Sequence, residues 1–110
     1  MSVQHKELAQ GRWLQLSFLE QMANIGSEVE RAINWKAKAN VAYSLQAFER
    51  ALELIDLTLD DTRNRSRLRE LARVREAIVD YFFGENLFMS SDALWKKYFL
   101  NFAYAARRNC

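Results

Sequence analysis

The near-absence of residues that break helices is the feature that most constrains this chain. Its 110 residues contain no proline and only three glycines, Gly11, Gly26 and Gly84. Average usage would supply about five prolines in a chain of this length. Because proline interrupts an α-helix and removes one of its hydrogen bonds, a sequence that excludes it is predicted to be helical nearly throughout.

Apolar residues recur at helical spacing in four stretches of the sequence. They predict one domain over residues 1–110, with helices at about 5–36, 40–60, 63–83 and 91–107. Asn40 is a candidate N-cap, and Gly84 suits a helix C-terminus. Gly26 lies within the apolar stripe of the first helix, which predicts close approach of another backbone. Helices of this length with short connections favour an all-α, antiparallel up-and-down four-helix bundle.

Charge and cysteine content indicate which partners and which cellular compartment to expect. A net charge of +2 gives little reason to expect nucleic acid or an acidic membrane as partner. The single cysteine, Cys110, can form neither a disulfide framework nor a cysteine-based zinc site, which indicates a reducing compartment. No apolar run approaches the roughly 20 residues that span a membrane, and the first residues lack the apolar segment of a signal peptide. We therefore expect a cytoplasmic protein that does not enter the membrane.

The second and third predicted helices carry charged rows of opposite sign at helical spacing. The acidic row consists of Glu49, Glu53, Asp56 and Asp60, and the other row of Arg65, Arg69, Arg73 and Glu76. In antiparallel neighbours the two rows either converge on the shared seam or both turn away from it, depending on the handedness of the bundle. We favour a ladder of salt bridges at the seam. A nucleic-acid surface is the weaker alternative, because the nearby acids cancel much of the field that phosphate binding needs.

Arg75 does not belong to the arginine row, because it projects into the middle of the apolar stripe of its helix. An unpaired guanidinium there would be too costly, so it should meet a carboxylate or line a water-filled pocket. Glu30 and Asp56, each at the edge of an apolar face, are the candidate partners. The sequence thus predicts a buried ion pair at Arg75 or, as the sharper alternative, an internal site for an anion or other ligand.

This chain lacks the residues that most common catalytic mechanisms require. The one histidine, His5, stands near the N-terminus, and neither paired Glu-x-x-His elements nor a glycine-rich phosphate loop is present. No cofactor is predicted, and we expect a protein that is not an enzyme. The surviving alternative is a Mg²⁺ site on the acidic row, because hard cations bind clustered carboxylates. The segment "ELID" resembles the acidic helix of MazG-type nucleotide pyrophosphohydrolases, although "SEVE" on the first helix has the wrong spacing for the second half of such a site.

In length, helix number and composition, the whole chain resembles the small helical bundles of the HEPN and nucleotidyltransferase substrate-binding group and, more distantly, the S23-like four-helix proteins. HEPN ribonucleases carry an arginine followed a few residues later by histidine, and the arginine segments "RNRSR" and "RVRE" contain no such histidine. The resemblance therefore implies a non-catalytic member that binds a partner or ligand. Such a member could be the accessory protein of a two-gene system, either toxin–antitoxin or nucleotidyltransferase-linked, with its protein partner encoded nearby.

Large apolar residues also fall outside the main helical stripes. They are candidates for an interface: Trp13, Leu16, Trp35, Leu100 and Tyr104. Aromatic residues on a second face favour contact with another chain, and two-fold homodimers are the commonest assembly. The segment Tyr81 to Ser91, "YFFGENLFMSS", is expected to cover one end of the bundle and plug its core; the alternative is that Phe83, Phe88 and Met89 rim a small pocket. The leading hypothesis is a homodimer acting through protein association, with a Mg²⁺-dependent nucleotide hydrolase and an RNA-binding protein as alternatives.

Overall fold

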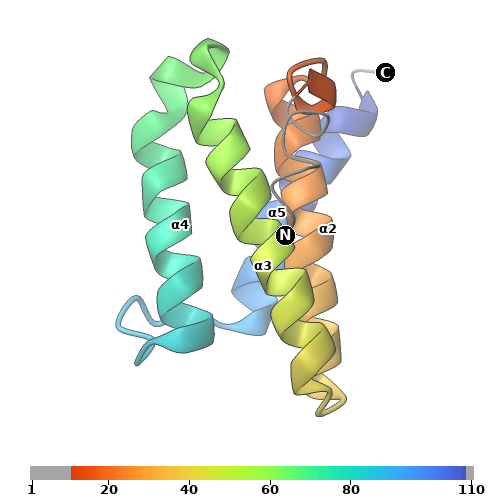
Figure 1. Ribbon diagram of the computed structural model, residues 1–110, viewed down its shortest axis with the longest axis vertical. Coiled ribbons are helices and arrows are strands. Elements are labelled where there is room, and N and C mark those ends of the chain that lie inside the picture. Colours follow the sequence, from red (N-terminus) through yellow and green to blue (C-terminus); the bar gives the residue numbers. More distant parts are fainter. Residues whose placement is uncertain (1–10, 109–110) are drawn as a thin grey trace.

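A computed structural model describes residues 11–108 of the chain as helices joined by short connections. The elements are α2 (Phe18–Ala37), α3 (Val41–Asp60), the 3₁₀ helix η2 (Thr62–Arg67), α4 (Leu68–Phe83) and α5 (Asp92–Arg108). Successive α-helices alternate in direction (Figure 1), which confirms the predicted all-α antiparallel up-and-down architecture. None of the helices in this described part is both long and apolar enough to cross a membrane.

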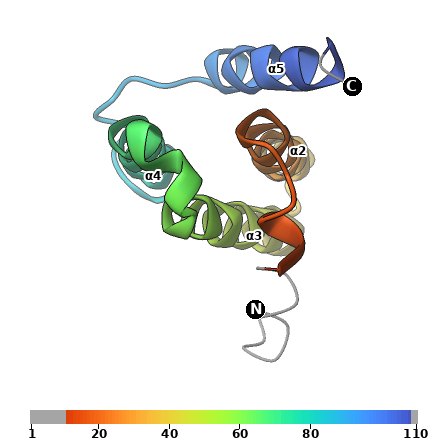
Figure 2. The ribbon, with the colours of Figure 1, turned by 90° about the horizontal axis from the view of Figure 1, so that it is seen from above.

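The four α-helices do not surround their core evenly. Figure 2 shows α2 between α3 and α5, with α4 beside α3 and α5 lying across the far side of α2. Close backbone contacts join α2 to α3, α2 to α5 and α3 to α4. The seam between α4 and α5 is instead spanned by the connecting residues 84–91 and contains a groove.

The predicted first helix, about 5–36, is wrong at its start. Its residues 5–10 lie outside the described part of the chain, a short helical segment ends at Trp13, and α2 begins only at Phe18. Ser17 caps α2, since the backbone N–H of Glu20 donates to the Ser17 hydroxyl and the Ser17 N–H donates to the Glu20 carboxylate. This capping box supplies local partners that favour a new helix start. The same contacts lower the pKa of Glu20 through hydrogen bonds from the Ser17 backbone and side chain.

The other helix boundaries follow the sequence more closely. Asn40 caps α3 as predicted, with its side-chain oxygen accepting from the Tyr43 N–H at 3.1 Å. The third predicted helix divides into η2 and α4, because the Asp61 side chain accepts from the Arg63 N–H and caps the 3₁₀ turn first. Gly84 ends α4, and α5 covers the fourth predicted helix.

The core is formed by side chains from all four α-helices. Its largest fully buried apolar members are Met22, Ile25, Ile33, Phe48, Ile55, Leu71 and Ile78. Gly26 lets α5 lie close to α2, since a Cβ atom at Gly26 would be 2.5 Å from the Phe99 Cβ. The predicted close approach is therefore present, but it is made by a side chain and not by another backbone.

Candidate functional site

The connection between α4 and α5 is held in a defined shape by hydrogen bonds. The two carboxylate oxygens of Asp80 accept from the backbone N–H groups of Leu87 and Phe88, at 2.9 and 3.0 Å. Asn86 bonds Ser90 twice, donating from its amide to the Ser90 carbonyl and accepting from the Ser90 N–H. Beyond the loop, the Tyr81 hydroxyl at the end of α4 is hydrogen-bonded to the Asp92 carboxylate at the start of α5. Burial, followed by the effects of Asp92, raises the pKa of Tyr81 to about 12.

This ordered loop presents large apolar side chains to solvent. Leu87 is 76 %, Phe88 55 % and Met89 82 % exposed, and we call these three residues the apolar loop surface. The expectation that the segment Tyr81 to Ser91 plugs the core holds only for Tyr81 and Phe82, which pack against it. The loop itself turns outward from the end of α4 (Figure 1), because Asp80 and Asn86 bond its backbone there, and Phe88 lines a groove as the alternative predicted. Exposed apolar side chains that are contiguous mark interaction sites more often than scattered ones do.

Met89 adds strain to this loop. Its φ is 55°, in the left-handed region that a side chain with a Cβ atom adopts at a cost of about 1–2 kcal/mol. Asn86, at φ 57°, tolerates this region better because its side chain bonds locally. Packing can offset little of this strain, since 82 % of Met89 is exposed. The loop therefore keeps an exposed methionine where glycine would fit with less strain.

The residues predicted to form an interface divide into two groups. Leu100 and Tyr104 on α5 are both exposed, as an interface residue would be, and Leu100 lines the groove between α2 and α5. The prediction that Trp13 forms part of an interface is wrong. Trp13 is buried in the core, and its indole Nε1–H donates to the Thr58 hydroxyl at 2.8 Å. Leu16 is half-buried and packs against the core. Trp35 is half-buried against the Tyr43 ring, at a centroid distance of 4.9 Å.

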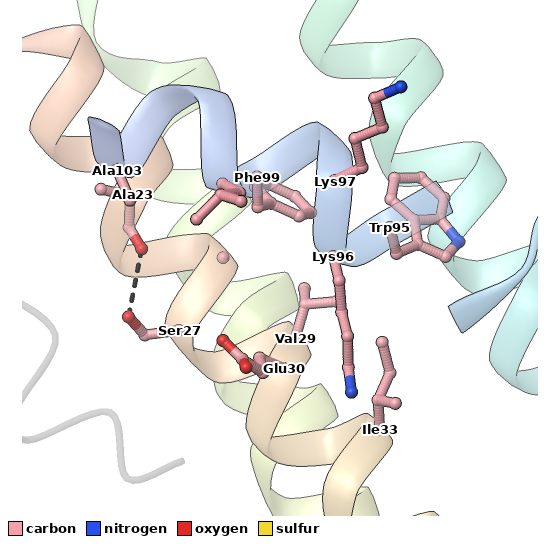
Figure 3. A pocket seen from close by; sticks show the side chains of 12 residues that line it. Ala23, Ser27, Val29, Glu30, Ile33, Trp95, Lys96, Lys97, Phe99 and Ala103 are labelled. Carbon is pink, nitrogen blue, oxygen red and sulfur yellow. Dashed lines mark hydrogen bonds between the residues drawn. The ribbon is translucent and has the colours of Figure 1, made fainter. Parts of the chain in front are cut away.

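Grooves lie between α5 and each of its neighbours α2 and α4. The groove between α2 and α5 has a volume of about 360 Å³ and is shown in Figure 3. Glu30 is exposed on the α2 wall of this groove and does not form the predicted pair with Arg75. On the α5 wall, Lys96 donates to the Asn34 side chain at 3.3 Å. The groove between α4 and α5 is larger, about 620 Å³, and the loop residues Phe88 and Ser90 form part of its wall.

Arg75 does find a carboxylate, but at the surface of the α3–α4 seam. Its Nε donates to Asp56 Oδ1 at 2.8 Å, and the side chains are 40 % and 52 % exposed, respectively. The hydrogen bond to Asp56 raises the pKa of Arg75. Of the two candidate partners the structure selects Asp56 over Glu30, and the expectation of a buried pair is wrong. The long arginine side chain extends past the apolar stripe, so its charged end reaches solvent.

The charged rows do not form the predicted ladder at every position. Arg73 lines the groove between α4 and α5, so its side chain lies on the side of α4 toward α5 and not at the seam with α3. The acidic row does not assemble a metal site either. Within residues 11–108, no three His, Cys, Asp or Glu side chains are placed to hold a metal ion together, the row Glu49, Glu53, Asp56 and Asp60 included. The carboxylates of such a row are spread along the length of α3, and Asp56 is engaged by Arg75.

A buried polar cluster joins the N-terminal segment to the end of α3, and sequence analysis missed it. Gln21, at its centre, donates from Nε2 to the Trp13 carbonyl at 3.0 Å and to Asp61 Oδ2 at 2.9 Å. The Asn64 amide donates to Gln21 Oε1 and to the Thr58 carbonyl. All five side chains are buried, and each polar side chain has a partner, as buried polar groups require. Its hydrogen bonds join residues as far as 45 positions apart in the sequence, so no local motif reveals it.

Asp61 is the charged member of this cluster. Its side chain is almost fully buried, and Arg63 donates to both carboxylate oxygens and also to the Leu16 carbonyl. The hydrogen bonds from Arg63 hold the pKa of Asp61 well below its ordinary value of 3.8, and that from Gln21 adds to them, against the opposing effect of burial. Since every partner is internal, the cluster serves the fold and offers no open position to a ligand.

Comparison with known proteins does not identify a family for this chain. A scan against protein-family models, a search of curated proteins and a search of solved structures each found no match for this chain. The resemblance to HEPN and related bundles therefore stays a prediction. Within residues 11–108, the apolar loop surface and the grooves beside α5 are the candidate sites for binding another molecule.

Proposed function

We propose that this protein acts without catalysis, through protein–protein association, and that it forms a homodimer by means of the apolar loop surface. The observation that carries the proposal is a loop whose backbone is fixed by Asp80 and Asn86 while Leu87, Phe88 and Met89 stay exposed. A loop ordered in this way loses little conformational freedom on binding, which favours affinity. We also propose a cytoplasmic location, and a protein encoded nearby as a further partner.

The concentration of exposed apolar residues in one part of the chain supports this proposal. Seven of the twelve exposed large hydrophobic residues in the described part fall between residues 83 and 104. They are Phe83, Leu87, Phe88, Met89, Leu94, Leu100 and Tyr104. Symmetric dimers use the same patch on both subunits, so an apolar patch can be covered by its own copy. The exposed residues Leu100 and Tyr104 of α5 would extend the contact beyond the loop.

Sedimentation velocity over about 1 to 100 μM protein tests the proposal, because this range brackets homodimers of ordinary affinity. The wild type should shift from monomer to dimer as its concentration rises. Leu87→Ser should weaken the dimer about tenfold or more, since it removes an apolar side chain from the contact. Val41→Ser, at an equally solvated apolar position on α3, is the matched control and should leave dimerisation unchanged.

Met89→Gly separates association from folding. Glycine relieves the left-handed strain at residue 89 while raising the entropy of the unfolded chain, so the free energy of unfolding should stay within about 1 kcal/mol of the wild type. The dimer should nevertheless weaken, because the methionine side chain is lost from the surface. A wild type that stays monomeric throughout the concentration range, or a Met89→Gly dimer as tight as the wild type, would contradict the proposal.

A further inference from the structure

The groove between α4 and α5 has the size and lining of a small-molecule site. Its volume of about 620 Å³ lies within the range of ordinary ligand pockets, roughly 300–1,000 Å³. Its walls are mainly apolar and aromatic, formed by Val74, Ala77, Phe88, Leu94, Trp95 and Tyr98. Burial raises the pKa of Tyr98, followed by the effect of Glu70, so this phenol stays neutral at physiological pH.

Trp95 supplies the observation that points to a ligand. Only 7 % of this residue is exposed, and its indole Nε1 is the one buried side-chain nitrogen or oxygen within residues 11–108 that has no hydrogen-bond partner. Figure 3 shows this nitrogen turned away from Glu30 and Lys96, toward the α4 side of the helix. Trp13 provides the contrast, since its buried indole donates to Thr58. A buried donor without an acceptor costs about 1–3 kcal/mol, and native proteins rarely leave one.

The polar groups around the groove define the chemistry of the missing acceptor. Arg73 lies on the α4 wall and forms no ion pair with any residue that the structure describes, and Ser90 contributes a hydroxyl from the loop. Arginine and the indole can only donate, so they fit an acceptor, and the positive charge favours an anionic one. Glu76 on the same wall opposes the attraction of Arg73 for an anion, which limits the ligand to a single negative charge.

We propose that the α4–α5 groove binds a small amphipathic monocarboxylate. The apolar part of the ligand lies between Val74, Leu94 and Tyr98, and a carboxylate oxygen accepts from Trp95 Nε1 within reach of Arg73. Because the nitrogen has no accessible surface, binding requires a small displacement of the wall. Phe88 and Leu94, both more than half exposed, are the wall residues least restrained against such a displacement. The groove shares Phe88 with the apolar loop surface, so the ligand and the proposed dimer contact would use the same residue.

Nuclear magnetic resonance of the indole groups tests this proposal directly, because the chain has only three tryptophans. The probes are sodium octanoate and 2-naphthoate, with octylamine as a control of similar apolar length and opposite charge. The Trp95 signal is assigned by its loss in Trp95→Phe. Either acid should produce a saturable downfield shift of the Trp95 indole proton while the Trp13 and Trp35 signals stay in place. Octylamine should produce none.

Two variants keep the test decisive. Arg73→Gln should weaken binding of the acid about tenfold, because it removes one charge-assisted interaction. Lys97→Gln removes a positive charge from the other groove beside α5 and should leave the affinity unchanged. Thermal melts confirm that both variants fold. The proposal is overturned if neither acid gives a saturable shift at Trp95, if all three indoles shift alike, or if Arg73→Gln binds the acid as tightly as the wild type.

Discussion

At the residue scale, the molecule depends on polar contacts that no pattern in the sequence displays. Helical periodicity identifies which apolar residues are buried, but it treats Gln21, Thr58 and Asn64 as ordinary polar positions. In the structure these side chains are buried, and the Asn64 amide donates to the Gln21 side chain and to the Thr58 backbone carbonyl across α2, α3 and η2. Trp13 was misplaced for the same reason, because its partner Thr58 is 45 residues away in the sequence. Such contacts require the fold to be known before they can be assigned.

Asp61 should make the stability of the protein depend on pH. Its pKa is lowered in the folded state, so its contribution is fully present above the unfolded pKa, about 3.9, and is lost as pH falls toward the folded value. Asp61→Asn should cost about 2–3 kcal/mol at pH 7, because charge-assisted hydrogen bonds in a buried site are lost. The difference between wild type and variant should shrink when urea unfolding is measured between pH 4 and pH 2.

The neighbouring exposed residue Asp60 provides the control for this experiment. Asp60→Asn should change the free energy of unfolding by less than about 0.5 kcal/mol at pH 7, as surface substitutions usually do. If Asp61→Asn were equally harmless at pH 7, the buried pair with Arg63 would not stabilise the fold.

Gly26 should resist substitution although it lies inside a helix. Alanine is favoured over glycine in helices by about 1 kcal/mol, yet its Cβ would be 2.5 Å from the Phe99 Cβ. Gly26→Ala should therefore lower the free energy of unfolding by about 1–3 kcal/mol, the usual effect of overpacking. Thermal or urea unfolding measures it, and Asn24→Ala, exposed on the same helix, is the control. A stabilised Gly26→Ala protein would show that α5 does not pack closely on α2.

At the element scale, the sequence predicted the presence of the helices better than it predicted where α2 starts or which charged residues pair between helices. The end of α2, the cap at Asn40 and the extent of α5 agree with the prediction within one or two residues. The start of α2 was missed because its apolar periodicity continues upstream, while the capping box of Ser17 and Glu20 was present in the sequence as "SFLE". The pairing of the charged rows could not be predicted from the sequence, because the side of α4 that faces α3 depends on the handedness of the bundle.

The Arg75–Asp56 pair should contribute little to the α3–α4 seam. Both side chains are substantially exposed, so solvent screens their attraction. A double-mutant cycle with Arg75→Met and Asp56→Asn should give a coupling energy below about 1 kcal/mol, decreasing as salt is added. Urea unfolding of the four proteins measures it. A coupling of several kcal/mol that is insensitive to salt would indicate the buried pair that the sequence suggested.

At the scale of the whole molecule, the number and alternation of helices were predictable and the open seam was not. Each amphipathic stripe indicates that a helix is buried, but it does not specify which neighbour covers it. The crossing of α5 over α2 depends on Gly26 and Phe99, and it leaves the α4–α5 groove beside a projecting loop. The apolar residues of "NLFM" predicted a buried plug, because periodicity cannot show that Asp80 and Asn86 hold the loop outward.

The central claim is that the apolar loop surface contacts a second copy of the protein. Amide hydrogen exchange, measured on the wild type at a concentration below and one above the dimer midpoint, tests it most directly. Exchange between residues 84 and 94 should slow at the higher concentration, while the exposed turn at residues 37–40 should exchange equally at both. Protection confined to another surface, or a dimer that leaves the loop exchange unchanged, would contradict the account.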